Sequence, residues 1–322
     1  MTYRIGLLGA SKIAPGAVIA PAKANPDFEV VAVGARDAER AKTYAKTHGI
    51  PHVAGSYAEL VRRDDIDVVY NALPPGGHLE WTVAALQAGK AVLCEKPFAM
   101  NAGEAQQMVD AAEATGRVLI EAFHYRFHSM IREAEALVRA GRLGAIRRGS
   151  AVFNVNIART PDELRWRAEL GGGGLMDLGC YPIHALRTLL GEEPVVRSAS
   201  GAFEGRVDTQ ITAELDFPGG ASASMGCAMI TDAVSATLTL EGELGRLEII
   251  PFIAPQRRGR LAITIDGETT VHEASGPTSY EAQLIHLGDV LSGRAKPLTG
   301  GADAVANMTV IDAVYVAAGR PT

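Results

Sequence analysis

The stretch Arg4-Ile-Gly-Leu-Leu-Gly9-Ala-Ser11-Lys-Ile-Ala14 decides the fold of the first third of this chain. It predicts a buried strand that passes directly into a turn, with Gly9, Ser11 and Ala14 at the spacing of a dinucleotide-binding fingerprint. In that fingerprint, small residues permit a tight turn, close approach of backbone N–H groups to a pyrophosphate, and close packing of the next helix. Because only the first place is glycine, the stretch also fits an ordinary strand–turn–helix.

The residues around this stretch alternate between β-rich runs and helical segments, the pattern of βαβ units with parallel strands. A helix starting after Asp37 is expected to end at Gly49, and Asn101, three residues before Glu104, predicts a cap for a helix reaching about Ala114. The predicted strands cover residues 4–9, 29–34, 52–54, 67–73, 91–95 and 117–121.

After Phe123 the pattern changes to a helix over 130–139 and then to strands of alternating polarity, with a final helix over 302–318. This alternation is typical of an antiparallel sheet that has helices on one face. We therefore predict an α/β protein: a doubly wound Rossmann domain over 1–123 and an α+β domain with a large, mainly antiparallel sheet over 124–322. The strands predicted in the second domain cover residues 146–156, 195–203, 209–217, 221–229, 236–241 and 246–250.

Composition narrows the partners of the chain. The net charge is −6 and the 31 basic residues are dispersed, which argues against a nucleic-acid partner. No window approaches the roughly 20 apolar residues of a membrane span, and the first residues do not resemble a signal peptide. An exposed face of the second sheet favours a homodimer or homotetramer.

Cysteine and histidine usage gives no sign of a metal site. Cys94, Cys180 and Cys227 are an odd number at spacings that match neither a disulfide framework nor a CxxC site. His124 and His128 are four residues apart but have no third ligand nearby in the sequence. We expect no bound metal, and a reducing cytoplasm as the location.

The end of the second predicted strand, Val33-Gly-Ala-Arg36-Asp37, bears on the nucleotide. An acidic residue there would bind the ribose hydroxyls of NAD, whereas a guanidinium can pair with the 2′-phosphate of NADP. Arg36 therefore favours NADP, with NAD as the alternative and a solvated surface arginine as the plain reading.

Two further segments carry groups suited to chemistry. Lys96 follows the apolar run 91–95, so it is expected at the carboxyl edge of the sheet, where ligands of such domains bind. The glycine run Gly171–Gly174 gives backbone freedom for close approach to a ligand, and it leads into a helix with Asp177 and Tyr181 on one face.

Glu95-Lys96-Pro97 together with the glycine-rich segment from Asp177 to Tyr181 resembles the Gfo/Idh/MocA oxidoreductase family. The resemblance extends over essentially the whole chain, including Leu73-Pro-Pro-Gly-Gly-His78 and Glu121-Ala-Phe-His-Tyr-Arg-Phe127. Many members have a histidine four residues after the aspartate, and this chain departs from them in having Tyr181. It is similar to the branch with dihydrodiol dehydrogenases, NADP-dependent xylose dehydrogenases and glucose–fructose oxidoreductase.

The resemblance implies that Tyr181 is the general acid/base, that Lys96 lowers its pKa and holds the substrate oxygen, and that Asp177 orients substrate or lysine. An adjacent cation favours a phenolate, which agrees with this assignment. His184 fits a packed helix histidine or a further group at the same face. The cofactor contacts that the turn motifs and the resemblance imply are Gly9, Ser11, Lys12, Ile13, Arg36, Leu73, Pro74, His78, Glu95, Lys96, His124, Trp166, Arg167 and Tyr280.

The expected substrate is a small polyhydroxylated or carbonyl compound, recognised by polar groups such as those of 154–156 and 159–165. Two alternatives accompany this dehydrogenase hypothesis. One is an NADP(H)-binding sensor without chemistry, which would not require Lys96, Asp177 and Tyr181 together. The other is an enzyme that retains its cofactor and shuttles hydride between two sugars.

Overall fold

The structure is a computed structural model that describes residues 2–321, and it divides into two compact units. One unit comprises Met1–Phe123 and Tyr280–Val305, and the other His124–Ser279 and Ala306–Thr322. The sequence placed all of 124–322 in the second domain, whereas the structure places 280–305 with the first unit. Two contacts explain the difference: Thr299 donates a hydrogen bond of 2.6 Å to the Glu121 carbonyl oxygen, and Gly288 packs against the Phe28 ring.

The first unit is built on a six-stranded sheet in which every pair of neighbours is parallel. Its strand order, β3-β2-β1-β4-β5-β6, is that of the doubly wound nucleotide-binding fold, so the predicted Rossmann fold is confirmed. The strands are β1 (Tyr3–Leu8), β2 (Phe28–Gly34), β3 (His52–Ala54), β4 (Val68–Asn71), β5 (Ala91–Cys94) and β6 (Leu119–Glu121).

The second helix of the first unit begins and ends at the residues that its capping side chain and its final glycine predict. Asp37 accepts a hydrogen bond from the Arg40 backbone N–H at the start of the second helix, and Gly49 ends it with a φ of 72°. The helices are α1 (Ala20–Ala24), α2 (Ala38–His48), α3 (Tyr57–Arg62), α4 (His78–Gln87), α5 (Ala102–Thr115) and α8 (Ser279–Leu291).

The second unit contains an eight-stranded sheet in the order β14-β13-β12-β11-β7-β10-β9-β8. Only β7 and β10 run parallel, and the other neighbours are antiparallel, so the predicted mainly antiparallel sheet is confirmed. The strands are β7 (Ile146–Asn154), β8 (Val195–Glu204), β9 (Val207–Asp216), β10 (Ser222–Ala228), β11 (Ser235–Gly242), β12 (Gly245–Ile250), β13 (Arg260–Ile265) and β14 (Glu268–Glu273). The sequence did not predict the last two.

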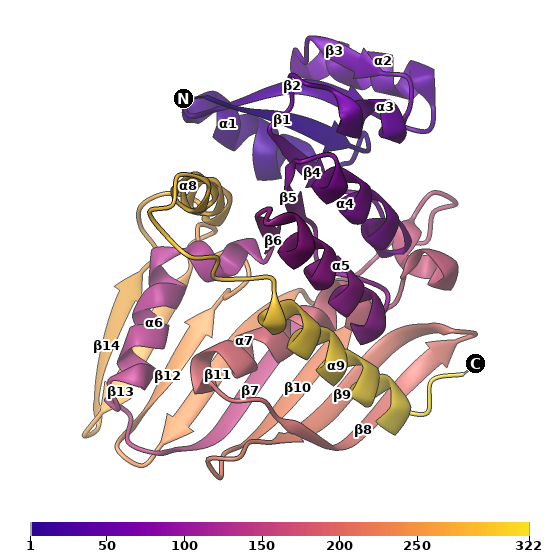
Figure 1. Cartoon of the computed structure of the whole chain (residues 1–322). Helices are drawn as coiled ribbons and strands as arrows, with labels where there is room; N and C mark the ends of the chain where they lie inside the picture. Colours follow the sequence, from indigo (N-terminus) through magenta and orange to yellow (C-terminus); the bar gives the residue numbers. More distant parts are fainter. Residues whose placement is uncertain (1, 322) are drawn as a thin grey trace. The chain divides into compact units, whose positions relative to one another are not determined.

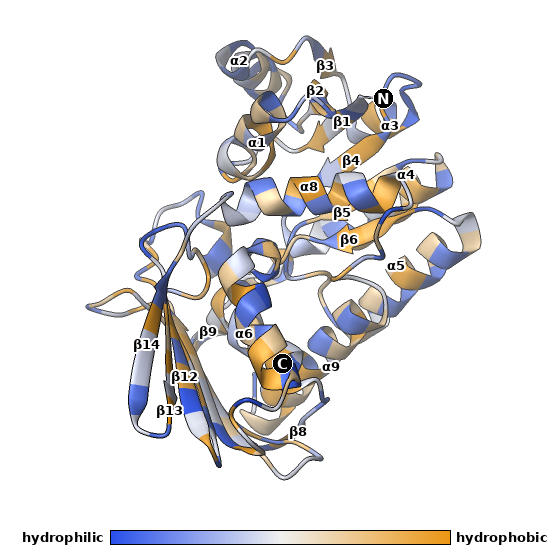
Figure 2. Ribbon diagram, turned by 90° about the vertical axis from the view of Figure 1, so that its left-hand side faces the viewer, coloured by the Kyte–Doolittle hydropathy of each residue, from blue (hydrophilic) through white to orange (hydrophobic). Residues whose placement is uncertain are grey.

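Helices α6 (Ser129–Arg139), α7 (Cys180–Leu190) and α9 (Ala302–Ala317) lie across one face of this sheet (Figure 1). Buried and exposed residues alternate along most of strand β9, as expected for a sheet that is covered by helices on one face. The edge strand β14 is exposed at every position and is coloured mainly in the hydrophilic half of the scale in Figure 2. Within residues 2–321, no helix is long and apolar enough to cross a membrane.

The cap of α5 offers a test of how local sequence fixes this fold. The Asn101 side chain accepts a hydrogen bond from the Glu104 backbone N–H at 2.9 Å, and the Glu104 carboxylate accepts one from the Met100 N–H at 3.1 Å. Asn101→Ala removes the acceptor and should lower the free energy of unfolding by about 1 kcal/mol in urea denaturation. Asn101→Asp keeps an acceptor and serves as the control. Equal stability of the alanine and aspartate variants would contradict the capping role.

Candidate active site

The turn after β1 brings together two of the predicted cofactor contacts. Gly9 has a φ of 95° and donates its N–H to the Gly34 carbonyl oxygen at 2.8 Å. A Cβ at Gly9 would lie 3.2 Å from Leu73 Cδ2, so this turn and the loop after β4 are in close contact. Ser11 Oγ accepts a hydrogen bond from the Ala14 N–H at 3.3 Å and thereby closes the turn.

Sequence reasoning missed two side chains that support this turn from α2. Arg40 donates to the Ala10 carbonyl oxygen at 2.7 Å, and the Tyr44 hydroxyl donates to the Ser11 carbonyl oxygen at 2.9 Å. Burial raises the pKa of Tyr44 to about 12. The signal was present in the spacing, because Arg36, Arg40 and Tyr44 are each four residues apart where α2 begins.

These residues fit a dinucleotide. Lys12, Arg36 and Arg40 are exposed cations beside the turn, and Ile13 keeps 41% of its surface exposed as an apolar contact. Arg36 also lies near Tyr57, whose pKa is raised by burial and lowered in part by that guanidinium. Cationic groups suit phosphates, and an exposed apolar side chain suits a flat ring.

Lys96 follows β5 at the carboxyl edge of the six-stranded sheet, as predicted. Its neighbour Glu95 accepts a hydrogen bond of 2.5 Å from the hydroxyl of the fully buried Tyr70. Burial raises the pKa of Tyr70 well above its ordinary value, and the charges of Glu95 and Tyr280 add to this effect. Glu95 and Tyr280 therefore lie near one buried phenol, and Lys96 directly follows Glu95 in the chain.

His78 is a buried residue that holds neighbouring backbone segments, not an exposed one. It is fully buried, and its Nε2 lies 2.8 Å from the Leu73 carbonyl oxygen while its Nδ1 lies 3.0 Å from that of Pro97. Burial lowers the pKa of His78, and the nearby Lys96 charge acts in the same direction. His78 thus links the loop containing Leu73 and Pro74 to the segment after Lys96.

In the second unit, Tyr181 lies in the first turn of α7 and is only 4% exposed. Its ring meets three aromatic neighbours edge-on, with centroid distances of 6.0 Å to His124, 5.8 Å to Tyr125 and 5.6 Å to Phe153. Edge-to-face packing at these distances fixes the orientation of a ring. The position of the Tyr181 hydroxyl is therefore set by its surroundings.

The histidines near Tyr181 are tied into the same cluster. His124 Nδ1 lies 2.8 Å from Ser279 Oγ, and the fully buried His184 has its Nδ1 2.6 Å from the Tyr125 hydroxyl. The Tyr125 ring also contacts the ring of His184 edge-on. His184 is therefore connected to Tyr181 through Tyr125, which the helical spacing alone did not indicate.

The glycine run does not have the environment that the sequence suggested. All four glycines are buried, and at Gly172, Gly173 and Gly174 the protein's own oxygen atoms occupy the space where side chains would be. A Cβ at Gly172 would lie 2.7 Å from the Leu164 and Arg165 carbonyl oxygens, and one at Gly173 would lie 2.2 Å from Asp208 Oδ1. Glycine is required here for close packing of the chain on itself, not for approach to a ligand.

Asp177 lies in a π-helical turn, Leu175–Gly179, that continues into α7. Its Oδ2 accepts a hydrogen bond of 2.5 Å from Arg165 Nε, and Glu163 accepts one of 2.9 Å from Arg165 Nη1. The charge of Asp177 is the largest influence on Arg165, whose pKa is raised. Asp177 is therefore oriented by an arginine that the sequence placed only near the pocket.

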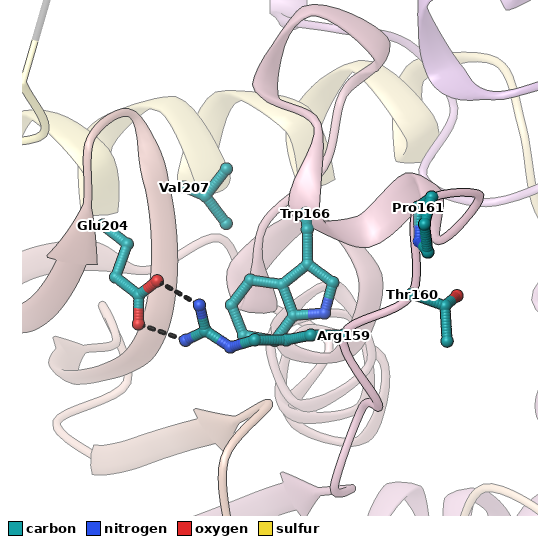
Figure 3. Close-up of a pocket in the computed structure, with 6 residues that line it drawn as sticks. All are labelled: Arg159, Thr160, Pro161, Trp166, Glu204 and Val207. Atoms are coloured by element: carbon teal, nitrogen blue, oxygen red, sulfur yellow. Dashed lines mark hydrogen bonds and ion pairs between the residues drawn. The ribbon is translucent and has the colours of Figure 1, made fainter.

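Trp166 and Arg159 line a pocket of about 430 Å³ in the second unit (Figure 3). The Arg159 guanidinium carbon lies 4.2 Å from the centroid of the Trp166 ring, and Glu204 holds that guanidinium with a bidentate ion pair. The indole Nε1 is buried and has no hydrogen-bond partner among the described residues. Arg167, also predicted to contact cofactor, is exposed and pairs with Glu169 at 2.8 Å.

Cys94, Cys180 and Cys227 are buried and form no disulfide, and burial raises the pKa of the Cys94 and Cys227 thiols well above the ordinary value. Such thiols are poor nucleophiles. Over residues 2–321 there is no cluster of three histidine, cysteine or acidic side chains that could hold a metal ion.

Two family models match the chain in sequence. Residues 3–123 match the model described as oxidoreductase family, NAD-binding Rossmann fold, and residues 131–248 match the GFO/IDH/MocA C-terminal domain. Together they cover most of the chain and fall on the two kinds of sheet described above.

Individual relatives match over most of their length. The D-xylose 1-dehydrogenase (NADP(+)) 2 of Haloferax volcanii is 33% identical over 97% of this chain and 96% of its own length. The trans-1,2-dihydrobenzene-1,2-diol dehydrogenase of Oryctolagus cuniculus is 36% identical over 82% of each chain. The crystal structure of an aldose–aldose oxidoreductase from Caulobacter crescentus with glycerol has a TM-score of 0.89 at 31% identity, covering 99% of this chain and 98% of that one.

The crowding of Gly173 can be tested directly. Gly173→Ala places a methyl group against the Asp208 carboxylate at a φ of 132°, so the free energy of unfolding should fall by about 1–3 kcal/mol. Gly226→Ala is the matched control, since the nearest atom to its Cβ is at 3.6 Å and its φ is ordinary. Chemical denaturation measures both variants, and equal losses would show that Gly173 is not crowded.

Proposed function

Because this chain belongs to the Gfo/Idh/MocA oxidoreductase family, we propose that it is an NADP-dependent dehydrogenase or reductase acting on a sugar, polyol or cyclic diol. The observation that supports this most is similarity over 97% of the chain to an NADP-dependent D-xylose dehydrogenase. The dihydrodiol dehydrogenase similarity extends the substrate class to cyclic diols. The nicotinamide, when bound, supplies or accepts the hydride.

Tyr181 is the proposed general acid/base, giving a proton to the substrate oxygen in reduction and removing it in oxidation. Its support is the rigid packing of the ring between His124, Tyr125 and Phe153, which aims one hydroxyl. Lys96 is proposed to assist because an ammonium group favours the phenolate form of a tyrosine and stabilises a developing oxyanion.

Asp177 is proposed to orient the substrate with its remaining acceptor positions. The Arg165 contact supports this role, since a carboxylate held by a guanidinium keeps one direction. A fixed carboxylate accepts hydrogen bonds from hydroxyl groups, which suits a polyol or sugar.

Arg36 is proposed to bind the 2′-phosphate of NADP. It is exposed two residues after β2, and Arg40, which donates to a carbonyl oxygen of the turn formed by Gly9, adds a second guanidinium that also lies near Tyr57. Arginine pairs with phosphate through two parallel N–H donors, which a ribose hydroxyl cannot match.

Replacing Tyr181 tests the acid/base role. Tyr181→Phe keeps the ring packing and removes the hydroxyl, so turnover should fall by about 100-fold or more in a spectrophotometric NADPH assay. The substrate is the most active compound from a screen of aldoses, inositols and vicinal diols. Tyr3→Phe, a tyrosine packed on Phe28 in the first unit, is the matched control. Unchanged turnover in Tyr181→Phe would overturn the assignment.

Replacing Arg36 tests the choice of cofactor. Arg36→Gln should weaken NADPH binding by about 10-fold or more in a fluorescence titration, because a charged hydrogen bond to phosphate is lost. NADH binding should change little. Arg62→Gln, an arginine in the last turn of α3, controls for net charge. Tighter binding of NADH than NADPH by the unaltered protein would remove the case for NADP.

A second function, hydride transfer between two sugars by a retained cofactor, is favoured by the similarity to the aldose–aldose oxidoreductase. The two functions differ in cofactor release. A dehydrogenase should lose NADPH on gel filtration and require added cofactor, whereas a sugar–sugar oxidoreductase should elute with nucleotide absorbance and turn over two aldoses without it.

A further inference from the structure

A buried carboxylate lies against the glycine run of the second unit. Asp208, in β9, is fully buried and accepts a hydrogen bond of 2.6 Å from the Leu175 backbone N–H through Oδ2. Its Oδ1 accepts one of 2.8 Å from the Tyr315 hydroxyl in α9. One carboxylate therefore joins strand β9, the start of the helical segment before α7, and the last helix.

The carboxylate and the backbone fit each other closely. A Cβ at Gly173 would lie 2.2 Å from Asp208 Oδ1, and one at Gly174 would lie 3.2 Å from Oδ2. Burial raises the pKa of Asp208, which its hydrogen bonds from Leu175 and Tyr315 partly offset. A buried charge of this kind adds little net stability, but a satisfied polar network specifies one geometry.

Tyr315 is itself held in place. The guanidinium carbon of Arg320 lies 4.1 Å from the centroid of its ring, and Arg320 Nε donates to the Arg206 carbonyl oxygen at 3.1 Å. Tyr315 is buried, so its hydroxyl has a fixed direction toward Asp208. The contacts of Asp208 thus reach back to the turn that precedes β9.

The hydrogen bond between Leu175 and Asp208 lies at the start of the helical segment that contains Asp177 and Tyr181. Leu175 begins the helical segment that continues through α7, with Asp177 two residues and Tyr181 six residues further on. Because successive residues of a helix move together, a rotation or slide at Leu175 displaces both side chains. The aromatic neighbours of Tyr181 fix its ring, while the carboxylate fixes where the helix starts.

We propose that Asp208 and Tyr315 are positioning residues, which hold the glycine run so that Asp177 and Tyr181 reach their working geometry. The inference rests on the proposed role of Tyr181 and adds residues that touch neither substrate nor cofactor. In this proposal, Asp208 and Tyr315 act on Asp177 and Tyr181 through the backbone of Gly173–Leu175.

Hydrogen exchange tests the contact without reference to activity. Asp208→Ala removes both acceptor oxygens, so amide exchange in a peptide covering 171–179 should accelerate about tenfold. Tyr315→Phe should do the same to a smaller degree and keeps the carboxylate. Asp216→Ala is the matched control, since Asp216 lies on the same strand in an exposed pair with Arg197. Unchanged exchange in both test variants would overturn the contact.

Kinetics then tests the positioning role. With the substrate from the screen, Asp208→Ala should lower kcat by about 10- to 100-fold, with little change in KM and in NADPH affinity. Tyr315→Phe should lower kcat less, and Asp216→Ala should leave it unchanged. Faster exchange with full kcat, or a loss that disappears when rates are corrected for the folded fraction, would overturn the role.

The two proposals fail in different ways. If Tyr181→Phe retains turnover, the acid/base assignment fails while the exchange result still decides the contact. If Tyr181→Phe is inactive and Asp208→Ala is fully active, only the positioning role fails.

Discussion

Close packing of oxygen atoms on a backbone without side chains governs the geometry of the second unit. Three consecutive glycines, 172–174, each leave room for an oxygen that belongs to the protein itself. Carbonyl oxygens of the preceding loop occupy one part of this space and the Asp208 carboxylate another. The glycine run consequently joins the loop that contains Arg165 and Trp166 to the helix that contains Tyr181.

In the first unit, buried side chains rather than glycines fix the geometry of the loops. There the parallel order of the strands gathers polar residues at one edge, and buried side chains then fix the loops that leave that edge. His78 contacts the backbone of two such loops, and Tyr70 holds the carboxylate beside Lys96. Both are enclosed, so loops at a solvent-facing edge acquire the rigidity of the core.

The sequence predicted the elements whose determinants are local. Strand runs, the caps at Asp37 and Asn101, and the stop at Gly49 were all correct, because each depends on neighbours within four residues. Strand β14 was missed since it has no buried residue and therefore little apolar signal. Strand β13 was missed although its buried residues alternate with less buried ones, as in the strands that were predicted. The packing of 280–305 on the first unit depends on contacts such as Thr299 with Glu121, which are 178 residues apart.

The residues of the candidate site also divide into those that local sequence indicates and those that depend on distant contacts. Lys96, Tyr181 and Arg36 could be named from motifs and family resemblance, as could Gly9 and Leu73. Asp208, Tyr315 and the Tyr125–His184 pair could not, because nothing in their local sequence shows which distant backbone or ring they contact. The chain leaves the eight-stranded sheet after β7 and returns to it at β8, so residues 155–194 form one long excursion from the sheet. Trp166, Asp177 and Tyr181 all belong to that excursion. Its length and contents can therefore diverge between paralogues while the strand register beneath it is preserved, provided that Asp208 and Tyr315 continue to hold the start of its helix.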